Sequence, residues 1–468
     1  MITRRGLIAA SAAGAVLTSC TMRTGARGGP DPYRNEVYGY GPLREDPNRV
    51  LDLPEGFSYR IVSRAGETMD DGLYVPGKID GMACFPLDGS RVALMRNHEL
   101  WPDDIERGPA GPRLRRLDRI DRTKAYDFDL DGRPLPGGTT TIVYDMAARR
   151  RVSQHLSLTG TTVNCAGGAT PWGTWLSCEE AVLRAGESAA KDHGWVFEVP
   201  VRTRGLAEPK PLFGLGRFEH EAAAIDPRTG IVYLTEDSRD DLGLFYRFLP
   251  NDRRRLEAGG RLQALGLREA PEGGDVRNFK DEPITWRPGD RKEIAWIDLE
   301  GTDNPHSDLR LRGQKAGAAF VGRGEGVFFG GDALYFACTS SGPTQNGQIL
   351  RYVPSPREGQ PGEADEPGRL ELFVEPDDEQ VLDFADNLTI APWGHIYACE
   401  DRYSDVDRNH LRALTPEGKV YTVARNVFEG NGELAGVCFS PDGKACFVNI
   451  ISPGITLAIT GPWEQFRA

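Results

Sequence analysis

Short apolar runs separated by polar turns recur along the chain, a pattern that favours strands over long helices. One unit repeats: a polar residue, a short apolar strand, a turn rich in Gly, Pro and Asp, a second apolar strand and a polar end. Two strands joined by a tight turn are typical of a β-hairpin. The copies run over residues 80–99, 165–180, 221–237, 325–340, 387–401 and 433–449.

The turns within these copies carry the residues that tight turns need. Examples are Asp226-Pro-Arg-Thr-Gly230 and Ser440-Pro-Asp-Gly443. The copies begin at uneven spacings, which suits propeller blades that carry loop insertions at their outer edges. We therefore predict an all-β fold, a six-bladed β-propeller in which each copy supplies the inner strands of one blade.

In a propeller, the innermost strand of every blade runs along one central axis. A polar residue that opens this strand in each copy therefore points at the same axis, although any one of them alone would be read as a solvated turn residue. The residues at this position are Asp80, Cys165, Glu221, Glu325, Asn387 and Glu433, and the adjoining strand ends add Glu180, Glu236 and Glu400. Carboxylates packed together repel one another unless cations neutralise them, so the pattern predicts a central metal site.

The residue types in this ring indicate which metals it would bind. Carboxylate and amide oxygens suit Ca²⁺. The Cys165 sulfur prefers a softer metal, iron or zinc. The alternative for Cys165 is a small buried residue, but Asn164 and two following glycines make its surroundings polar and flexible. With only 7 histidines, a zinc hydrolase built on histidines is disfavoured, and His98 and His220 are expected to support ligands rather than to bind metal.

Arg323 lies two residues before Glu325 in the sequence. A guanidinium beside a metal ring would hold an oxyanion by paired hydrogen bonds, and phosphate is the best geometric match. The alternative is a surface arginine. Metals and an arginine together favour hydrolysis of a phosphate ester, in which cations polarise the phosphoryl oxygens. The sequence has no Gly-x-Ser-x-Gly elbow, P-loop or dinucleotide-binding glycine motif.

Composition narrows the range of partners. The 468-residue chain carries 56 basic and 69 acidic side chains, a formal net charge of −13. This balance argues against a nucleic acid or an anionic membrane surface as a partner, although an acidic excess is also ordinary for a soluble enzyme. The 56 glycines and 33 prolines agree with many strands and turns.

The N-terminus has the features of an export signal. Paired Arg4 and Arg5 precede an alanine-rich apolar stretch, residues 7–17, that is too short to span a bilayer. This is typical of a twin-arginine signal peptide, which we assign to residues 1–19. The sequence Leu-Thr-Ser-Cys20 resembles a lipoprotein box, so Cys20 is expected to carry a lipid anchor. The alternative is a cleaved signal with an incidental cysteine.

Residues 20–50, rich in Gly, Pro and Arg, are expected to form a tether, and residues 51–468 the propeller. These assignments predict a protein exported by the twin-arginine machinery and held in the periplasm or at the cell surface. Few disulfides are expected, because most of the eight cysteines lie in apolar strand-like runs. No sequence feature indicates an oligomer, so a monomer is expected.

Several motifs, in order along nearly the whole chain from residue 53, resemble the PhoX-type alkaline phosphatases. The most specific begins Asn164-Cys-Ala-Gly-Gly and ends Leu-Ser-Cys-Glu-Glu180. The other matching segments are residues 53–59, 80–83, 216–221, 235–238, 322–326, 399–402 and 440–443.

This resemblance implies a six-bladed propeller with a mixed Fe³⁺ and Ca²⁺ cluster that cleaves phosphate monoesters after twin-arginine export. It implies that Cys165 bridges two irons and that Arg323 holds phosphate, which makes both candidate catalytic residues. Glu180, Glu236 and Glu325 would be cluster ligands. The residues assigned mainly to calcium, from the repeat geometry, are Glu221, Asn387, Glu400 and Glu433.

Two other functions stay open at this point. One is a calcium-dependent propeller lactonase or phosphotriesterase, whose site needs fewer carboxylates and no thiolate. The other is a lipid-tethered binding propeller without catalytic activity, in which the cluster is structural. A Cys165→Ser variant would keep activity as a lactonase and lose it as a phosphatase.

Overall fold

The structure, a computed structural model, describes residues 33–402 and 408–466. The chain divides into residues 1–31 and 32–468, and only the second unit contains described residues. The assigned signal peptide, Cys20 and the first part of the tether therefore lie outside the described residues. Within the described ranges, 28 strands and a single short α-helix, α1 (Leu309–Lys315), confirm the all-β prediction.

The described strands form six sheets. The two four-stranded sheets are β4 (Ile79–Pro86), β5 (Arg91–His98), β6 (Gly137–Asp145) and β7 (Arg150–Thr161), and β26 (Leu434–Phe439), β27 (Ala445–Ile450), β28 (Ile455–Thr460) and β3 (Ser58–Arg64). The three-stranded sheet is β8 (Asn164–Ala169), β9 (Thr174–Glu179) and β10 (Val196–Pro200). The six-stranded sheet is β22 (Ala385–Ile390), β23 (Ile396–Glu400), β24 (His410–Leu414), β25 (Val420–Asn426), β2 (Leu51–Pro54) and β1 (Leu43–Arg44).

The nine-stranded sheet takes in two of the recurring hairpins. Its strands, in spatial order, are β11 (His220–Ile225), β12 (Val232–Glu236), β13 (Phe245–Pro250), β14 (Gly260–Leu267), β16 (Arg291–Asp298), β21 (Arg369–Val374), β20 (Gln348–Val353), β19 (Ala333–Cys338) and β18 (Gly324–Gly330). The two-stranded sheet is β15 (Gly274–Asp275) with β17 (Ala319–Phe320). The 3₁₀ helices are Ile105–Arg107, Pro112–Leu114, Leu117–Arg119, Arg122–Lys124, Phe213–Leu215, Leu256–Ala258, Glu363–Asp365 and Trp463–Phe466.

Every recurring hairpin of the sequence forms an antiparallel strand pair. The pairs are β4–β5, β8–β9, β11–β12, β18–β19, β22–β23 and β26–β27. Each first strand carries a β-bulge near its start, which bends the strand and changes where the next side chain points. The repeat seen in the sequence is therefore a repeat of backbone geometry.

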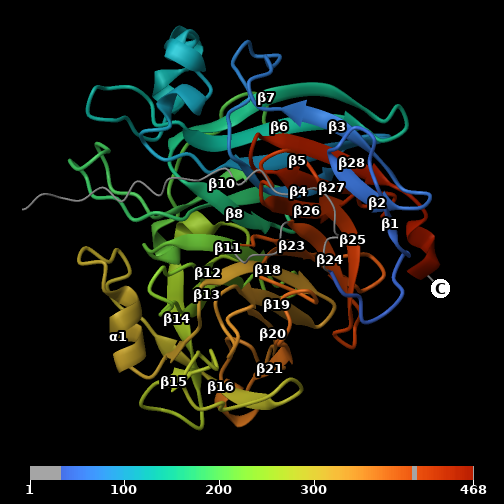
Figure 1. Cartoon of the computed structure of the whole chain (residues 1–468). Helices are drawn as coiled ribbons and strands as arrows, with labels where there is room; N and C mark the ends of the chain where they lie inside the picture. The colour runs from blue at the N-terminus through green and yellow to red at the C-terminus, as the bar shows by residue number, and fades with distance from the viewer. Residues whose placement is uncertain (1–32, 403–407, 467–468) are drawn as a thin grey trace, which may run out of the picture. The chain divides into compact units, whose positions relative to one another are not determined.

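These first strands surround one central cavity of about 310 Å³. It is lined by residues of β4, β8, β11, β18, β22 and β26, which is the arrangement of a propeller (Figure 1). The propeller-like fold is thus confirmed. The sheets are unequal in size, however, and do not divide the chain into six equal blades.

Glycines allow the first strands to approach one another closely. A Cβ on Gly81 in β4 would lie 2.5 Å from the Cα of Ala166 in β8. A Cβ on Gly326 in β18 would lie 2.7 Å from the carbonyl oxygen of Asp386 in β22. Because no side chain fits at these points, backbone packs against backbone, and the polar residues beside the glycines are brought together.

The hydrophobic core lies between neighbouring sheets rather than at the axis. Met95 and Leu158 of the β4–β7 sheet pack in one cluster with Phe197 and Val199 of β10. A second cluster joins the six-stranded sheet to the sheet that contains β28. Since strands in these positions are covered on both faces, they read as continuous apolar runs in the sequence.

The N-terminal part of the folded unit closes the sheet formed by the C-terminus. β3 pairs with β28, with Ser58 opposite Thr460 and Arg64 opposite Ile455. Residues 33–50, predicted to be tether, instead belong to the fold. Tyr40 is buried, its ring packs edge-on against Trp463, and β1 pairs with β2. These contacts extend the folded unit before the expected boundary at residue 51, because a short, glycine-rich segment can still be anchored by one buried aromatic side chain.

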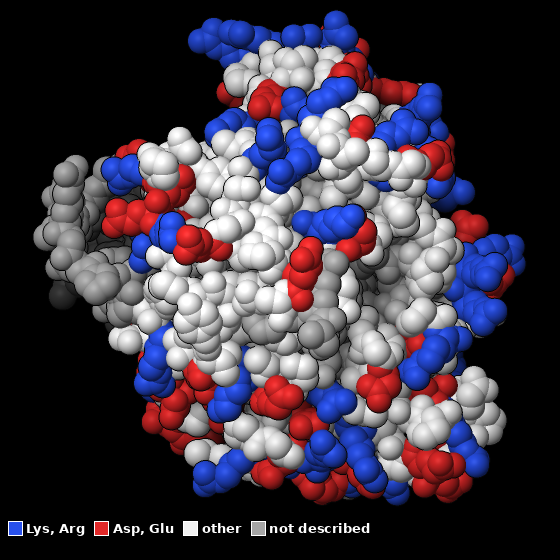
Figure 2. Space-filling view, turned by 90° about the vertical axis from the view of Figure 1, so that its right-hand side faces the viewer, with Lys and Arg blue, Asp and Glu red and all other residues white. Residues whose placement is uncertain are grey.

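Figure 2 shows acidic and basic side chains interspersed over one face of the molecule, so the charge of −13 is not gathered there into a patch of one sign. All seven described cysteines are free thiols. None of the described helices combines the length and the apolar composition that a membrane crossing requires.

Candidate metal centre

Three overlapping groups of metal-ligating side chains lie where the first strands begin. In each group, one ligand atom from every residue lies within 4.8 Å of the others. Because Glu221 and Asp386 each belong to two groups, the groups form one continuous cluster. The groups are Cys165, Glu180 and Glu221; Glu221, Glu325 and Asp386; and Asp386, Asp401 and Glu433.

The repeated strand ends position these side chains. Glu180 follows the end of β9, Asp401 follows the end of β23, and Glu433 comes directly before β26. A bulge at the start of a strand turns one extra side chain out of the regular alternation. The bulged starts of β8, β11, β18 and β22 carry Cys165, Glu221, Glu325 and Asp386.

Glu221 gives the clearest indication that a cation belongs here. Both of its carboxylate oxygens are buried, and neither has a hydrogen-bond partner among the described residues by distance and angle, although the Cys165 thiol lies close enough to act against the rise of its pKa. Burial, followed by the charges of Glu325 and Asp386, raises its pKa well above the usual value. A buried carboxylate without donors is costly unless a proton or a cation neutralises it. Oxygen ligands at the centre of an acidic cluster therefore fit a bound metal.

Other carboxyl groups of the cluster also have raised pKa values. Burial and then Asp237 raise the pKa of Glu180 and of Glu325 well above the usual range. Burial and then Asp401 raise the pKa of Asp386 to about 8. These carboxylates cannot all be ionised near neutral pH on their own, so either protons or bound cations must neutralise part of their charge.

Cys165 lies at one end of the cluster. Burial and then the charge of Asp80 raise the pKa of its thiol well above the usual value. The thiol donates a hydrogen bond to Asp80 Oδ2 at 3.4 Å. Asp80 thus lies against the cluster but outside the three groups. A thiol in this environment becomes a thiolate only when a metal binds it.

Arg323 is the cation next to the cluster. Its Nε and Nη2 each donate to Asp237 at 2.8 Å, and Nη2 lies 3.2 Å from Glu325 Oε1. Burial lowers its pKa, but the charges of Glu325 and Asp237 outweigh this and raise it. Nη1 has no hydrogen bond to a described residue. A quarter of the side chain is exposed, so the guanidinium is fixed on one side and accessible on the other.

Two predicted ligands, Glu236 and Glu400, lie outside the groups. Glu236 faces into its own sheet, where it accepts hydrogen bonds from Tyr246 Oη at 2.7 Å and Leu244 N at 3.0 Å. Glu400 is also turned away and accepts hydrogen bonds from both the backbone and the ring of His410 at 3.0 Å. Asn387 lines the central cavity.

The sequence analysis missed Asp386 and Asp401 as group members, and Asp237 as the partner of Arg323. Side chains alternate across a strand, so a shift of one residue exchanges the axis-facing side for the opposite side. Adjacent acids mark the ends of three second strands: Glu179-Glu180, Glu236-Asp237 and Glu400-Asp401. In each pair it is the second acid that lies at the cluster: Glu180 and Asp401 belong to the groups, and Asp237 binds Arg323.

The histidines near the cluster are held by other groups. His98 Nδ1 lies 3.0 Å from the Gly77 carbonyl and its Nε2 lies 2.8 Å from Thr140 Oγ1. His220 Nε2 lies 2.9 Å from the Gly216 carbonyl. Burial lowers the pKa of both rings to about 3, so they stay neutral. Neither belongs to the three groups.

His193 gives a testable pH dependence of stability. It is buried between Glu179 Oε1, 2.7 Å from Nδ1, and Asp127 Oδ2, 3.1 Å from Nε2. Burial opposes its protonation, but these carboxylates raise its pKa from 6.5 to about 9. Its stabilising contribution is therefore complete below pH 6.5 and is lost as the pH rises through 9.

We expect the free energy of unfolding to fall by about 3 kcal/mol across this window because of His193. Denaturant unfolding at a series of pH values measures the fall. A His193→Gln variant should lack this part of the pH dependence while keeping the rest. An equal slope in both proteins between pH 6.5 and 9 would contradict the prediction.

Comparison with known proteins finds a matching family and similar solved structures. A family model described as alkaline phosphatase PhoX matches residues 38–454. Among solved structures, the chain is similar to Pseudomonas fluorescens PhoX in complex with vanadate, a transition-state analogue. The TM-score is 0.64 and the identity 19%, over 88% of this chain and 96% of that one.

A gluconolactonase from Xanthomonas campestris also matches, with a TM-score of 0.38 and 8% identity over 86% of this chain and 98% of that one. A protein of unknown function from Bacteroides thetaiotaomicron gives 0.40 and 10%, over 86% and 76%. No curated protein sequence matches the chain. These two matches have low TM-scores and support no conclusion about this chain. The similarity to Pseudomonas fluorescens PhoX supports the fold.

Proposed function

The chain belongs to the alkaline phosphatase PhoX family, and we propose that it is an extracytoplasmic, metal-dependent phosphomonoesterase with an iron–calcium cluster at the axis. Membership of the family gives the reaction, hydrolysis of a phosphoric monoester. The single observation that carries the metal dependence is Glu221, whose two buried oxygens lack donors at the junction of two acidic groups.

The residues of the three groups fit the proposed ions. Cys165, next to Glu180, supplies the soft ligand that iron prefers. The group of Asp386, Asp401 and Glu433 offers only carboxylate oxygens, which suit Ca²⁺. Bound there, the cations would polarise phosphoryl oxygens and lower the pKa of a water molecule. Glu236 and Glu400, expected ligands from the sequence, are left out of this proposed set because they lie outside the groups, whereas the Asn387 amide oxygen stays a proposed calcium ligand.

Arg323 is proposed to bind the phosphoryl group. Asp237 holds its Nε and Nη2 in one orientation, which leaves Nη1 and the exposed edge for the substrate. A guanidinium fixed in advance loses little entropy when it binds an anion, and it stabilises charge that develops on the phosphoryl oxygens. The neighbouring carboxylates repel an anion unless metals neutralise them, so substrate binding is expected to depend on the metals.

Further proposals rest on the sequence. The recurring hairpins and their bulges support six blades, two of which share the nine-stranded sheet. The paired arginines support export by the twin-arginine machinery to the periplasm or cell surface, and the lipoprotein box supports a lipid anchor at Cys20. We propose a monomer that takes phosphate monoesters and no nucleic acid.

The test is elemental analysis of the purified, folded protein together with turnover of p-nitrophenyl phosphate at alkaline pH. We expect iron and calcium in the protein, and loss of turnover when a chelator removes them. Returning the metals should restore turnover, which excludes unfolding as the cause.

Calcium alone, without phosphatase turnover, would contradict the proposal. It would favour the lactonase or binding propeller instead, and Cys165 would then be a buried structural cysteine. A Cys165→Ser variant that keeps full phosphatase turnover and its iron would contradict the proposed role of the thiolate.

A further inference from the structure

Three pairs of adjacent acids end second strands of the hairpins: Glu179-Glu180, Glu236-Asp237 and Glu400-Asp401. The first acid of each pair is turned away from the axis and accepts backbone N–H groups. Glu179, Glu236 and Glu400 are all buried. Each accepts a backbone N–H at or close to the start of the strand that follows it in its sheet: Gly194 and Trp195 for Glu179, Leu244 for Glu236, and His410 for Glu400. The second acid of each pair points to the axis. These first acids therefore lie directly behind side chains of the site.

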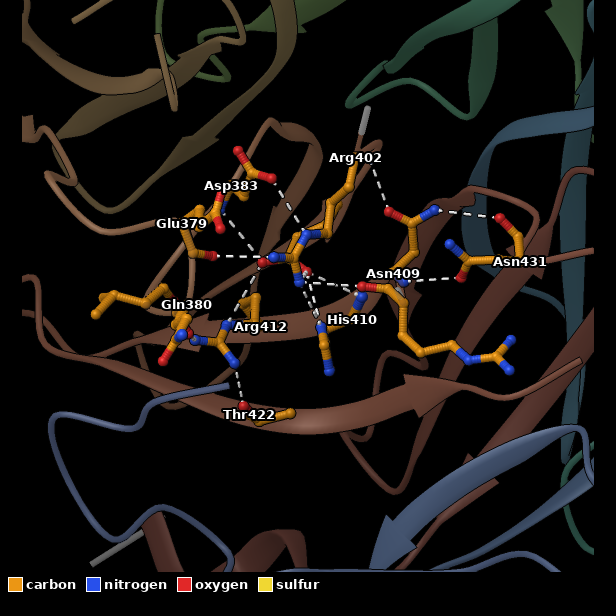
Figure 3. Close-up of polar contacts among 12 residues, drawn as sticks. Glu379, Gln380, Asp383, Arg402, Asn409, His410, Arg412, Thr422 and Asn431 are labelled. Carbon is orange, nitrogen blue, oxygen red and sulfur yellow. Dashed lines mark hydrogen bonds and ion pairs between the residues drawn. The ribbon is translucent and has the colours of Figure 1, made fainter. Parts of the chain in front are cut away.

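Glu400 has the most extensive contacts. Its Oε2 accepts the His410 backbone N–H and faces His410 Nδ1, both at 3.0 Å, and lies 3.4 Å from Arg402 Nη1. Arg412 Nε lies 3.7 Å from Oε1. Figure 3 shows Arg402, His410 and Arg412 pointing toward one another at this place.

Glu400 also reaches the segment that leads into β22, the strand that carries the candidate ligand Asp386. Its Oε1 accepts the backbone N–H of Asp383 at 3.3 Å, and Arg402 Nε donates to Asp383 Oδ2 at 3.2 Å (Figure 3). Asp383 lies three residues before Asp386. One side chain thus connects the segments that carry Asp386 and Asp401, two members of the same group.

Glu179 repeats this connection on another part of the axis. Its Oε1 accepts the Thr162 backbone N–H at 3.1 Å, and Thr162 lies three residues before Cys165. Its Oε2 accepts N–H groups of Gly194 and Trp195 at 2.9 and 3.2 Å. It therefore connects the segments that carry Cys165 and Glu180, which also share a group. Glu236 has the link to the next strand but no such link to the first strand.

We propose that Glu179 and Glu400 are positioning residues that set the spacing of paired metal ligands, Cys165 with Glu180 and Asp386 with Asp401. This inference rests on the proposed function only in taking those residues as ligands. A carboxylate that accepts several buried N–H groups fixes its surroundings, because leaving any donor unpaired is costly. Ligands held at the correct spacing bind metal more tightly than ligands that must be ordered on binding.

The test compares three glutamine variants of the full-chain holoprotein: Glu179→Gln, Glu400→Gln and Glu358→Gln as control. The amide keeps the size of the side chain, but its NH₂ group faces N–H groups whose hydrogen bonds the carboxylate accepted. Glu358 is a suitable control because it is also a buried glutamate. It accepts hydrogen bonds from Arg247 at 2.6 Å and Ser355 N at 2.8 Å, and it belongs to none of the groups.

Each protein is held in excess chelator, and the iron and calcium that remain bound are measured over time by elemental analysis. We expect metal loss about 10–100-fold faster from both positioning variants, and an unchanged rate in the control. Glu179→Gln should release iron preferentially and Glu400→Gln calcium. A role in folding alone would lower the melting temperature of all three variants without this separation.

Metal loss at the control rate from both positioning variants would overturn the inference. If Glu400→Gln does not fold, Glu400→Asp keeps the charge but cannot span both the His410 and Asp383 N–H groups, and it should show an intermediate rate. Because the readout is metal and not turnover, a protein that holds metal but does not hydrolyse the ester refutes only the proposed function. A wild-type protein that holds no metal refutes both.

Discussion

Replacing Glu221 by glutamine is expected to lower kcat/KM for a phosphate monoester by at least about 10³-fold, since bound metal supplies several kcal/mol of transition-state stabilisation. Glu221 belongs to two of the three groups, so its loss weakens both. In metal-free protein, by contrast, Glu221→Gln is expected to stabilise the fold. Removing an unpaired buried carboxylate is expected to raise the free energy of unfolding by about 1–3 kcal/mol.

A loss of activity in the metal-loaded protein together with a gain of stability in the metal-free protein distinguishes a metal ligand from a structural residue. Denaturant unfolding with and without chelator measures the stability, and elemental analysis measures the metal. The Glu358→Gln control should lose stability in both conditions and keep its metal, because Glu358 is already paired with Arg247. A Glu221→Gln protein that retains its metal, or that is destabilised with and without chelator, would show that Glu221 is not a ligand.

Replacing Arg323 by lysine is expected to reduce kcat/KM by about 10²–10³-fold while the metal content stays the same. Lysine keeps the positive charge, but it cannot bind Asp237 with two parallel hydrogen bonds and still present an ordered donor to the substrate. If Arg323 contacts the phosphoryl group, inhibition by vanadate should weaken by a similar factor, because a transition-state analogue uses the same contacts.

Arg228→Lys is the matched control for this variant. Arg228 also binds an aspartate, Asp226, through two nitrogens at 3.0 Å, but it lies in the turn between β11 and β12. It should leave kcat/KM unchanged. If Arg323→Lys loses metal as well as activity, Arg323 organises the cluster instead of binding the phosphoryl group.

The repeat was visible in the sequence because both the strands and the turn of each hairpin require particular residue types. A hairpin of two apolar strands must bury both faces, so it leaves apolar runs, and its tight turn requires residues such as Asp226 and Gly230. The polar residue that opens the first strand is conspicuous because nothing else in the run is charged. Cys165, Glu221, Glu325 and Glu433 were found in this way, and all four lie in the groups.

The register at the ends of the second strands was harder to predict. Glu236 and Asp237 are both acids, and only their direction separates them. That direction depends on the bulge and on the N–H groups of the next strand, which are far away in the sequence. Asp386 was missed for the same reason: the bulge between Ala385 and Leu388 decides which residue of β22 faces the axis.

The tether was misjudged by composition. Residues 33–50 contain the glycines and prolines of a linker, but Tyr40 packs into a core made by strands from the other end of the chain. A contact over so many residues leaves no trace in a local pattern. Sequence reasoning of this kind detects local repeats well and long-range anchoring poorly.

The pairing of β3 with β28 has a consequence for how the protein is made. β3 leaves the ribosome long before β28, and translation at about 5–20 residues per second separates the two strands by roughly 20–80 s. Throughout this interval β3 is an unpaired edge that could join another nascent chain. The ring cannot close before β28 has been synthesised, so a chain truncated before β28 has no route to the finished fold.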